Sequence, residues 1–129
     1  MWEEESRVYK IYISHIEDFK EYNIFLDKLN AANEFEWINL AKPGDGNENL
    51  ELQIKDVDVV IILSGQYSKN PSSVEKQIKI AQKFKKPLIV VRPYGMENVP
   101  TFIENLAQDI VGWNTPCIIE VIKENALEN

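Results

Sequence analysis

The side chains best suited to chemistry follow apolar runs that have the character of β-strands. They are the following: Ser14, His15, Ser64, Tyr67, Arg92 and Tyr94. An arginine can hold a phosphate through two parallel hydrogen bonds, and a tyrosine ring can stack on a nucleobase or a nicotinamide. The helix expected to begin at residues 70–73 offers backbone N–H groups, which suit a pyrophosphate. Together these features favour a dinucleotide as ligand.

Each candidate also has a structural explanation that the sequence leaves open. Arg92 could hold the acidic segment around Glu97 or Glu104, and the two tyrosines could cover an edge of a sheet. A lone histidine such as His15 is often a capping or packing residue. Trp37 lies on an expected strand, where the alternation of side chains favours a position in the core.

The composition is that of a soluble globular chain, and it excludes several kinds of site. The 129 residues match one ordinary domain, with 44% hydrophobic and 27% charged side chains. A formal net charge of -7 repels a phosphate backbone, so nucleic acid is not expected as a partner. With one cysteine and one histidine, no internal disulfide can form and no metal site is expected. Cys117 falls in the expected last helix, where we predict a buried structural thiol.

The sequence also bears on location. Residues 1–5 are mostly acidic and lack the basic start and apolar run of a signal peptide. The longest uninterrupted apolar run, residues 59–63, is far shorter than the roughly 20 residues that span a bilayer. We therefore expect a cytoplasmic protein without membrane contact.

Short apolar runs alternate with amphipathic stretches along the whole chain. The expected strands are residues 8–14, 35–39, 57–63, 87–91 and 109–112, and the expected helices are residues 18–30, 48–55, 70–85, 101–107 and 114–125. Strands that alternate with helices in this way form a parallel sheet between two helical layers. We predict an α/β, flavodoxin-like three-layer sandwich in which a ligand lies at the carboxyl ends of five parallel strands.

Standard motifs of such sheets are missing from the sequence. There is no Gly-x-x-x-x-Gly-Lys-Ser/Thr phosphate loop, and the pair Gly44 and Gly46 is followed by Asn49 where a dinucleotide fingerprint would have glycine. A response-regulator receiver would carry an aspartate at the end of the third strand, where this chain has Ser64. A Gly-x-Ser-x-Gly elbow is also missing. These four classes of site are therefore excluded.

Eight short segments, taken in order, carry a resemblance to a known family. They are the following: Tyr12-Ile13-Ser14-His15, Phe35-Glu36-Trp37, Asp58-Val59-Val60-Ile61, Gly65-Gln66-Tyr67, residues 74–81, Lys86-Pro87, Arg92-Pro93-Tyr94-Gly95 and residues 111–115. The chain resembles the TIR-like (Toll/interleukin-1 receptor-like) domains of prokaryotes over about residues 8–122, in particular those of Thoeris-type antiphage systems. Many such domains cleave NAD at the nicotinamide N-glycosidic bond and make an ADP-ribose-type immune signal. Others only assemble with partners.

The resemblance places Gln77 where the family has its catalytic glutamate and Ser73 where the family has a tryptophan. Helical rotation directs Gln77 toward the apolar side of its helix and Glu75 away from it. Glu75 is better explained by a capping box that begins at Ser72. An amide keeps the shape of a glutamate but not its negative charge, so the chain as written is predicted to be nearly inactive. Restoring glutamate at position 77 is expected to restore cleavage if the rest of the site is sound.

The resemblance also implies a ligand and partners. NAD would be a substrate, with no separate cofactor and no metal, and its site would include Ser14, His15, Trp37, Ser64, Tyr67, Arg92 and Tyr94. The unusually long loop at residues 40–49 predicts self-association or contact with a TIR-signalling partner. Two rivals stay open. One is a non-enzymatic interaction module, and the other is a nucleoside-processing glycosyl transferase, for which a second carboxylate is missing at the expected place.

Overall fold

The computed structural model describes residues 7–33, 35–43, 49–92 and 99–128. The strands there are β1 (Tyr9–Ile13), β2 (Trp37–Asn39), β3 (Val59–Leu63), β4 (Leu88–Val91) and β5 (Asp109–Val111). The helices are α1 (Lys20–Asn30), α2 (Leu50–Ile54), α3 (Gly65–Lys69), α4 (Pro71–Lys83), α5 (Thr101–Leu106) and α6 (Thr115–Asn125). Each expected strand and helix is present, most of them one or more residues shorter than predicted.

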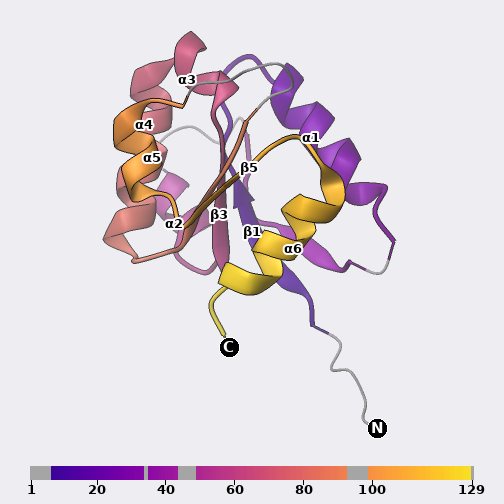
Figure 1. The fold of residues 1–129 in the computed structure, drawn as a ribbon. Coiled ribbons are helices and arrows are strands. Elements are labelled where there is room, and N and C mark those ends of the chain that lie inside the picture. The colour runs from indigo at the N-terminus through magenta and orange to yellow at the C-terminus, as the bar shows by residue number, and fades with distance from the viewer. Residues whose placement is uncertain (1–6, 34, 44–48, 93–98, 129) are drawn as a thin grey trace, which may run out of the picture.

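The strands form one parallel sheet in the order β2-β1-β3-β4-β5. Helices α1 and α6 cover one face of this sheet, and α2, α3, α4 and α5 cover the other (Figure 1). The predicted flavodoxin-like α/β sandwich with five parallel strands is therefore confirmed. Because the chain moves outward from β1 to β2 and then returns to β3 on the other side of β1, the strand order reverses between β1 and β3. This reversal is where open α/β sheets bind ligands.

Burial along the strands follows their place in the sheet. All five residues of the central strand β3 are buried, as its continuous apolar sequence predicts. The outer strands β2 and β5 contain no fully buried residue. The core thus lies around β1, β3 and β4, and it holds the carboxyl ends of these strands in fixed positions.

Helix α4 begins at the predicted place but is capped differently. The Asn70 side chain accepts a hydrogen bond from the Ser73 N–H at 3.2 Å, and Pro71 occupies the first turn. Glu75 instead accepts a hydrogen bond from the Tyr67 hydroxyl at 2.9 Å. The predicted capping box from Ser72 to Glu75 is therefore wrong, because Asn70 already occupies the capping position.

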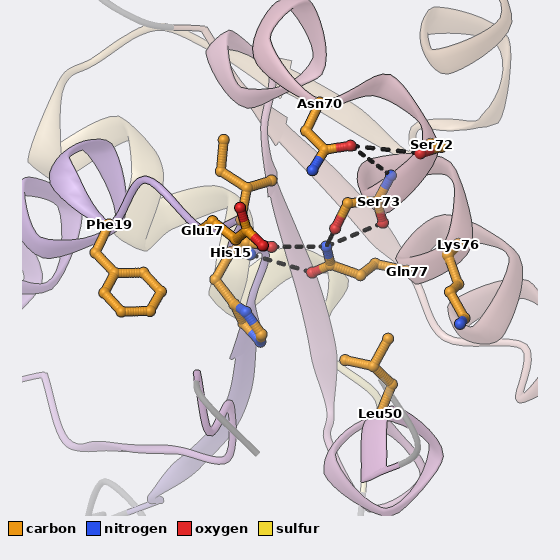
Figure 2. A pocket seen from close by; sticks show the side chains of 10 residues that line it. His15, Glu17, Phe19, Leu50, Asn70, Ser72, Ser73, Lys76 and Gln77 are labelled. Carbon is orange, nitrogen blue, oxygen red and sulfur yellow. Dashed lines mark hydrogen bonds between the residues drawn. The ribbon is translucent and has the colours of Figure 1, made fainter. Parts of the chain in front are cut away.

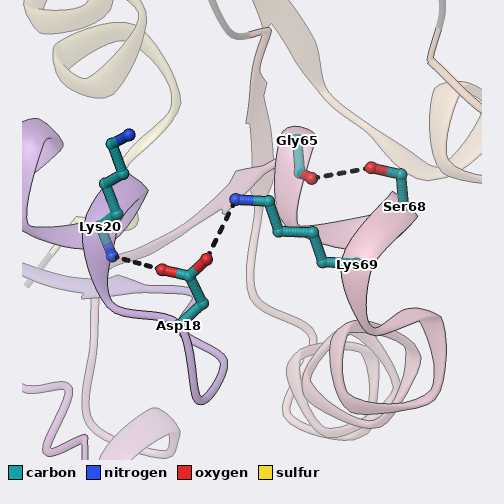
Figure 3. A network of polar contacts seen from close by, with 5 residues as sticks. All are labelled: Asp18, Lys20, Gly65, Ser68 and Lys69. Carbon is teal, nitrogen blue, oxygen red and sulfur yellow. Dashed lines mark hydrogen bonds and ion pairs between the residues drawn. The ribbon is translucent and has the colours of Figure 1, made fainter.

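Helix α3 was expected to be a loop, since five residues are too few for a periodic apolar pattern. The Ser68 hydroxyl donates to the Gly65 carbonyl at 3.1 Å within it (Figure 3). An ion pair between Lys69 and Asp18 at 3.3 Å links this helix to the segment before α1. Asp18 also accepts a hydrogen bond from the Lys20 N–H at 3.0 Å. Both charged groups are exposed, so the ion pair contributes little stability.

The prediction that Cys117 is a buried thiol is wrong, because its side chain is exposed. Cys117 lies in the first turn of α6, where its N–H donates to the Asn114 side chain at 3.0 Å. The buried face of this helix begins one residue later with Ile118 and continues with Val121 and Ile122. An apolar residue in a first turn can thus precede the buried stripe of its helix.

In the part of the chain that the structure describes, no helix has the length and apolar character needed to cross a bilayer. The same residues contain no group of three or more histidine, cysteine, aspartate or glutamate side chains arranged to hold a metal ion.

Candidate functional site

A cavity of about 550 Å³ opens between the carboxyl end of β1 and the first turns of α4. We call it the β1–α4 cavity. It is lined by His15, Ile16, Glu17, Phe19, Leu50, Asn70, Ser72, Ser73, Lys76 and Gln77 (Figure 2). Its position beside β1 and β3 agrees with the place that the reversal of strand order predicts for a ligand.

The inner wall of the cavity is organised by Gln77, which is 1% exposed. Its Oε1 accepts hydrogen bonds from the Tyr12 hydroxyl at 2.7 Å and from the His15 N–H at 3.1 Å. Its Nε2 donates to the His15 carbonyl at 2.8 Å, to the Ser73 carbonyl at 3.1 Å and to the Ser73 hydroxyl at 3.3 Å. Both ends of the amide are therefore fully used, and Gln77 fastens α4 to the end of β1 (Figure 2).

These contacts also fix the state of the His15 ring. Gln77 Oε1 can only accept, so the Tyr12 hydroxyl proton points to it, and the Tyr12 oxygen receives the proton on His15 Nε2 at 3.2 Å. Burial lowers the pKa of His15, and a hydrogen bond with the Gln53 side chain partly opposes this shift. Burial therefore disfavours the charged form of the His15 ring. Burial likewise raises the pKa of Tyr12, which stays protonated.

A second buried glutamine holds the preceding residue. Ser14 donates its hydroxyl proton to Gln66 Oε1 at 2.6 Å, and Gln66 Nε2 donates to the Ser14 carbonyl at 3.0 Å. The Ser14 hydroxyl oxygen accepts from the Leu63 N–H at 2.9 Å. A third glutamine, Gln53, is 4% exposed and accepts from the Lys42 N–H at 2.8 Å. We call Gln53, Gln66 and Gln77 the glutamine clamp, because the side chain of each is hydrogen-bonded to the backbone of another segment.

Sequence reasoning identified only one member of the glutamine clamp. Gln77 was found through the family resemblance, and its helical phase, which coincides with that of the buried residues Val74, Ile78 and Ala81, supported the choice. Gln53 has the same signal in weaker form, three residues after the buried Leu50 in a helix of only five residues. For Gln66 no periodic signal exists, since α3 itself was not predicted.

The outer side of the cavity is formed by accessible groups. Glu17, Phe19, Ser72 and Lys76 are all exposed. Among the described lining residues, Glu17 carries the one carboxylate and Lys76 the one ammonium group. Of these four, Ser72 alone lies in a segment that the sequence indicated, the helix start at residues 70–73. Extending the site by four residues beyond His15 would have reached Glu17 and Phe19. The cavity thus combines a closed inner wall with an open face that carries one charge of each sign.

Among the described residues, the structure brings two of the predicted site residues together. His15 and Gln77 line the cavity, whereas Ser14 is fully buried behind it against Gln66. Ser64 is also buried, and its hydroxyl lies 3.4 Å from the Val91 carbonyl. These positions give the two serines a place in the framework behind the cavity.

The remaining predicted residues lie elsewhere. The Tyr67 ring packs against Phe102, with the ring centres 5.5 Å apart. Trp37 is the first residue of β2, so it lies at the amino ends of the strands, away from the β1–α4 cavity at their carboxyl ends. Its side chain is partly buried against the core, as predicted, and borders a different cavity. Arg92 follows β4 and its N–H donates to the Val111 carbonyl at 2.9 Å. Tyr94 and Glu97 lie outside the described residues, as does most of the predicted contact loop, residues 44–48.

Comparison with known proteins identifies the domain. Residues 12–98 match the sequence profile of the family described as "Thoeris protein ThsB, TIR-like domain", which is about two thirds of the chain. The chain belongs to this family. All ten residues that line the β1–α4 cavity of this TIR-like domain fall inside the matched span. The resemblance found in the sequence is therefore confirmed, and it includes the candidate site.

A solved structure supports the fold of this TIR-like domain. The structure of the CMP N-glycosidase BcmB from Clostridium botulinum superposes with a TM-score of 0.53 and 12% sequence identity. The alignment covers 88% of this chain and 98% of that chain. No curated protein sequence matches the chain. At this level of identity, the likeness to BcmB establishes a shared fold and nothing more.

Proposed function

We propose that this TIR-like domain binds NAD or an ADP-ribose-type nucleotide in the β1–α4 cavity and releases little or no nicotinamide from it. The observation that carries the proposal is the cavity itself. Its volume of about 550 Å³ lies within the roughly 300–1,000 Å³ of small-molecule sites, and it opens where the strand order reverses.

The chemistry of the lining suits a nucleotide with a phosphorylated sugar. Lys76 provides a positive charge, and the hydroxyl of Ser72 provides a donor, both at the start of α4. The Ser73 N–H is already taken by Asn70, so a phosphate would rely on side chains more than the sequence analysis expected. Phe19 and Leu50 add apolar surface for a flat ring. Such a mixture of apolar walls and a few polar groups is typical of ligand pockets.

The weak cleavage follows from Gln77. Departure of neutral nicotinamide leaves positive charge on the ribose, which a carboxylate stabilises and an amide does not. Loss of one such electrostatic contact typically costs about 3–4 kcal/mol, or roughly 10²- to 10³-fold in rate. The hydrogen bonds of Gln77 strengthen this argument, because its amide is occupied by Tyr12, His15 and Ser73. A domain of this kind would recognise the nucleotide without producing the ADP-ribose-type signal.

Two relationships support the choice of ligand. Many domains that resemble this one cleave the N-glycosidic bond of NAD, and BcmB is described as an N-glycosidase of CMP. Both substrates join a base to a ribose 5′-phosphate through an N-glycosidic bond. CMP is therefore the second ligand to test, and it represents the nucleoside-processing alternative.

The proposal is tested by calorimetric titration of NAD, ADP-ribose and CMP into the purified chain, with nicotinamide release followed in parallel. We expect NAD or ADP-ribose to bind with a dissociation constant between about 1 mM and 1 μM, and no nicotinamide above background. Ser72→Trp, which places a large ring at the exposed mouth of the cavity, should abolish binding. Gln82→Trp, on an exposed position of the same helix, should not.

The outcomes separate the candidate functions. Binding of CMP but not of NAD or ADP-ribose would move the proposal to the nucleoside-processing class. Heat signals equal to those of buffer for all three nucleotides would contradict nucleotide binding and favour the interaction module. Self-association through residues 40–49 stays a prediction, which sedimentation of the same sample would test at low and high salt.

A further inference from the structure

Phe19 is an aromatic residue in an unusual place. It is 41% exposed, and it occupies the residue before α1, where it makes no side-chain capping hydrogen bond. Helices prefer serine, threonine, aspartate or asparagine at this position. The Lys20 N–H is instead capped by Asp18 at 3.0 Å. The phenyl ring therefore does not cap the helix, although its exposure to water is unfavourable.

The ring stands at the end of a row of packed aromatic side chains. Phe19 lies 6.5 Å from Tyr22 between ring centres, Tyr22 lies 5.9 Å from His15, and His15 lies 5.7 Å from Tyr12. Tyr22 is buried, and its hydroxyl accepts a hydrogen bond from Asn39 at 2.8 Å. The row runs from the core to the cavity, so the Phe19 ring has a buried aromatic neighbour behind it.

Phe19 and Lys76 lie on opposite sides of the β1–α4 cavity (Figure 2). A nucleotide has the same polarity, with a flat apolar base at one end and a charged phosphate at the other. A phosphate near Lys76 would therefore direct the base toward Phe19. The cavity thus has an aromatic ring on one side and an ammonium group on the other, which matches the two ends of such a ligand.

We propose that Phe19 is the stacking platform for the base of the bound nucleotide and so a determinant of its specificity. The proposal rests on the proposed function and names the residue that reads the base. Phe19 takes the stacking role that the sequence suggested for Tyr67. The Tyr67 hydroxyl donates to Glu75, and its ring packs on Phe102 and does not line the cavity. Stacking of a base on an aromatic side chain is worth about 1–3 kcal/mol by alanine substitution, which corresponds to roughly 5- to 150-fold in affinity.

The experiment measures the dissociation constant of NAD for the whole chain and four variants. Phe19→Ala removes the ring, Phe19→Leu keeps apolar volume without an aromatic face, and Phe19→Trp enlarges the face. Phe102→Ala is the matched control, because Phe102 is 39% exposed, contacts a tyrosine ring and does not line the cavity. Thermal melting of each variant confirms that it is folded.

We expect Phe19→Ala to weaken NAD binding by about 10-fold, Phe19→Leu to weaken it several-fold, and Phe19→Trp to bind at least as tightly as the parent. Phe102→Ala should stay within about twofold. The tryptophan introduced at position 19 should also lose fluorescence when NAD binds, beyond the change seen in the parent with its 3 native tryptophans.

Two results would overturn the inference in different ways. If the parent binds NAD and Phe19→Ala binds it as the parent does, or Phe19→Leu matches Phe19→Trp, then stacking is wrong while nucleotide binding stands. If the folded parent binds neither NAD, ADP-ribose nor CMP, then the proposed function fails and the stacking role fails with it.

Discussion

The two sides of the β1–α4 cavity differ in how their polar groups are used. On the inner side, Gln77 and Gln66 are each 1% exposed and bind the backbone of His15 and Ser14. On the outer side, Glu17 and Lys76 are exposed to solvent. The polar groups of the inner side are hydrogen-bonded within the fold, whereas the charged groups of the outer side are accessible to a ligand.

The buried side chains fix the backbone around the cavity, and the exposed side chains are the ones that can contact a ligand. A buried amide that is fully hydrogen-bonded fixes the segment it holds, whereas an unsatisfied one is costly. Gln66 and Gln77 therefore hold Ser14 and His15 at the end of β1, and the exposed side chains of Glu17 and Phe19 that follow are accessible to a ligand. Position 77 is suited to an amide in this chain, because its Nε2 faces the carbonyl oxygens of His15 and Ser73.

The largest expected effect is on stability and comes from removing the Gln77 amide of the glutamine clamp. Gln77→Leu should lower the free energy of unfolding by about 2–4 kcal/mol, because it leaves the Tyr12 hydroxyl and the His15 backbone groups buried without partners. Urea denaturation measures this change. Gln82→Leu, at an exposed position on the same helix, should change stability by no more than about 0.5 kcal/mol. An equal change in the free energy of unfolding for the two variants would show that the hydrogen bonds of Gln77 do not stabilise the fold.

A carboxylate at position 77 should make stability depend on pH. In Gln77→Glu one oxygen would face two carbonyl oxygens, so the protonated form is favoured and the pKa of the new carboxyl rises above the usual value of about 4.3. The unfolded chain then ionises first as the pH rises. Relative to the parent, the variant should be most stable below about pH 4 and lose about 1–3 kcal/mol by pH 7.

The same variant tests the family's catalytic chemistry in this chain. The Tyr12 hydroxyl and the His15 N–H would still donate to the new carboxylate and hold it in the inner wall of the cavity, so we expect nicotinamide release to stay close to background at neutral pH. Stability parallel to that of the parent from pH 4 to pH 8, together with brisk nicotinamide release, would contradict this account. It would support the sequence-based expectation that position 77 needs only its negative charge restored.

A smaller effect is expected on the open side. Lys76→Ala should weaken NAD binding by about threefold to 10-fold at low salt, and by less at high salt, because the lost attraction to phosphate is screened. Lys79→Ala removes the same charge from an exposed position of α4 that does not line the cavity. If both variants lose affinity equally, the effect is one of net charge and not of a contact in the cavity.

The sequence predicted the framework better than the site. Continuous apolar runs such as β3 and the periodic face of α4 have strong signals, and both are present as expected. The burial of Gln77 followed from the same helical periodicity. Tyr67 was misjudged as a cavity residue because its role depends on α3, a helix of five residues whose direction no local pattern encodes. Phe19 was missed because exposure at a helix start becomes visible only when the neighbouring elements are in place.

The most direct test of the two-sided cavity is an NMR titration of the parent chain with NAD. The account predicts shifts of the backbone amides of Phe19, Ser72 and Lys76, while the side-chain amide of Gln77 keeps its position and slow exchange with water. The amide of Trp37, at the opposite end of the sheet, should not move. Shifts confined to the region of Trp37, or no shift at about 10 mM NAD, would contradict the account.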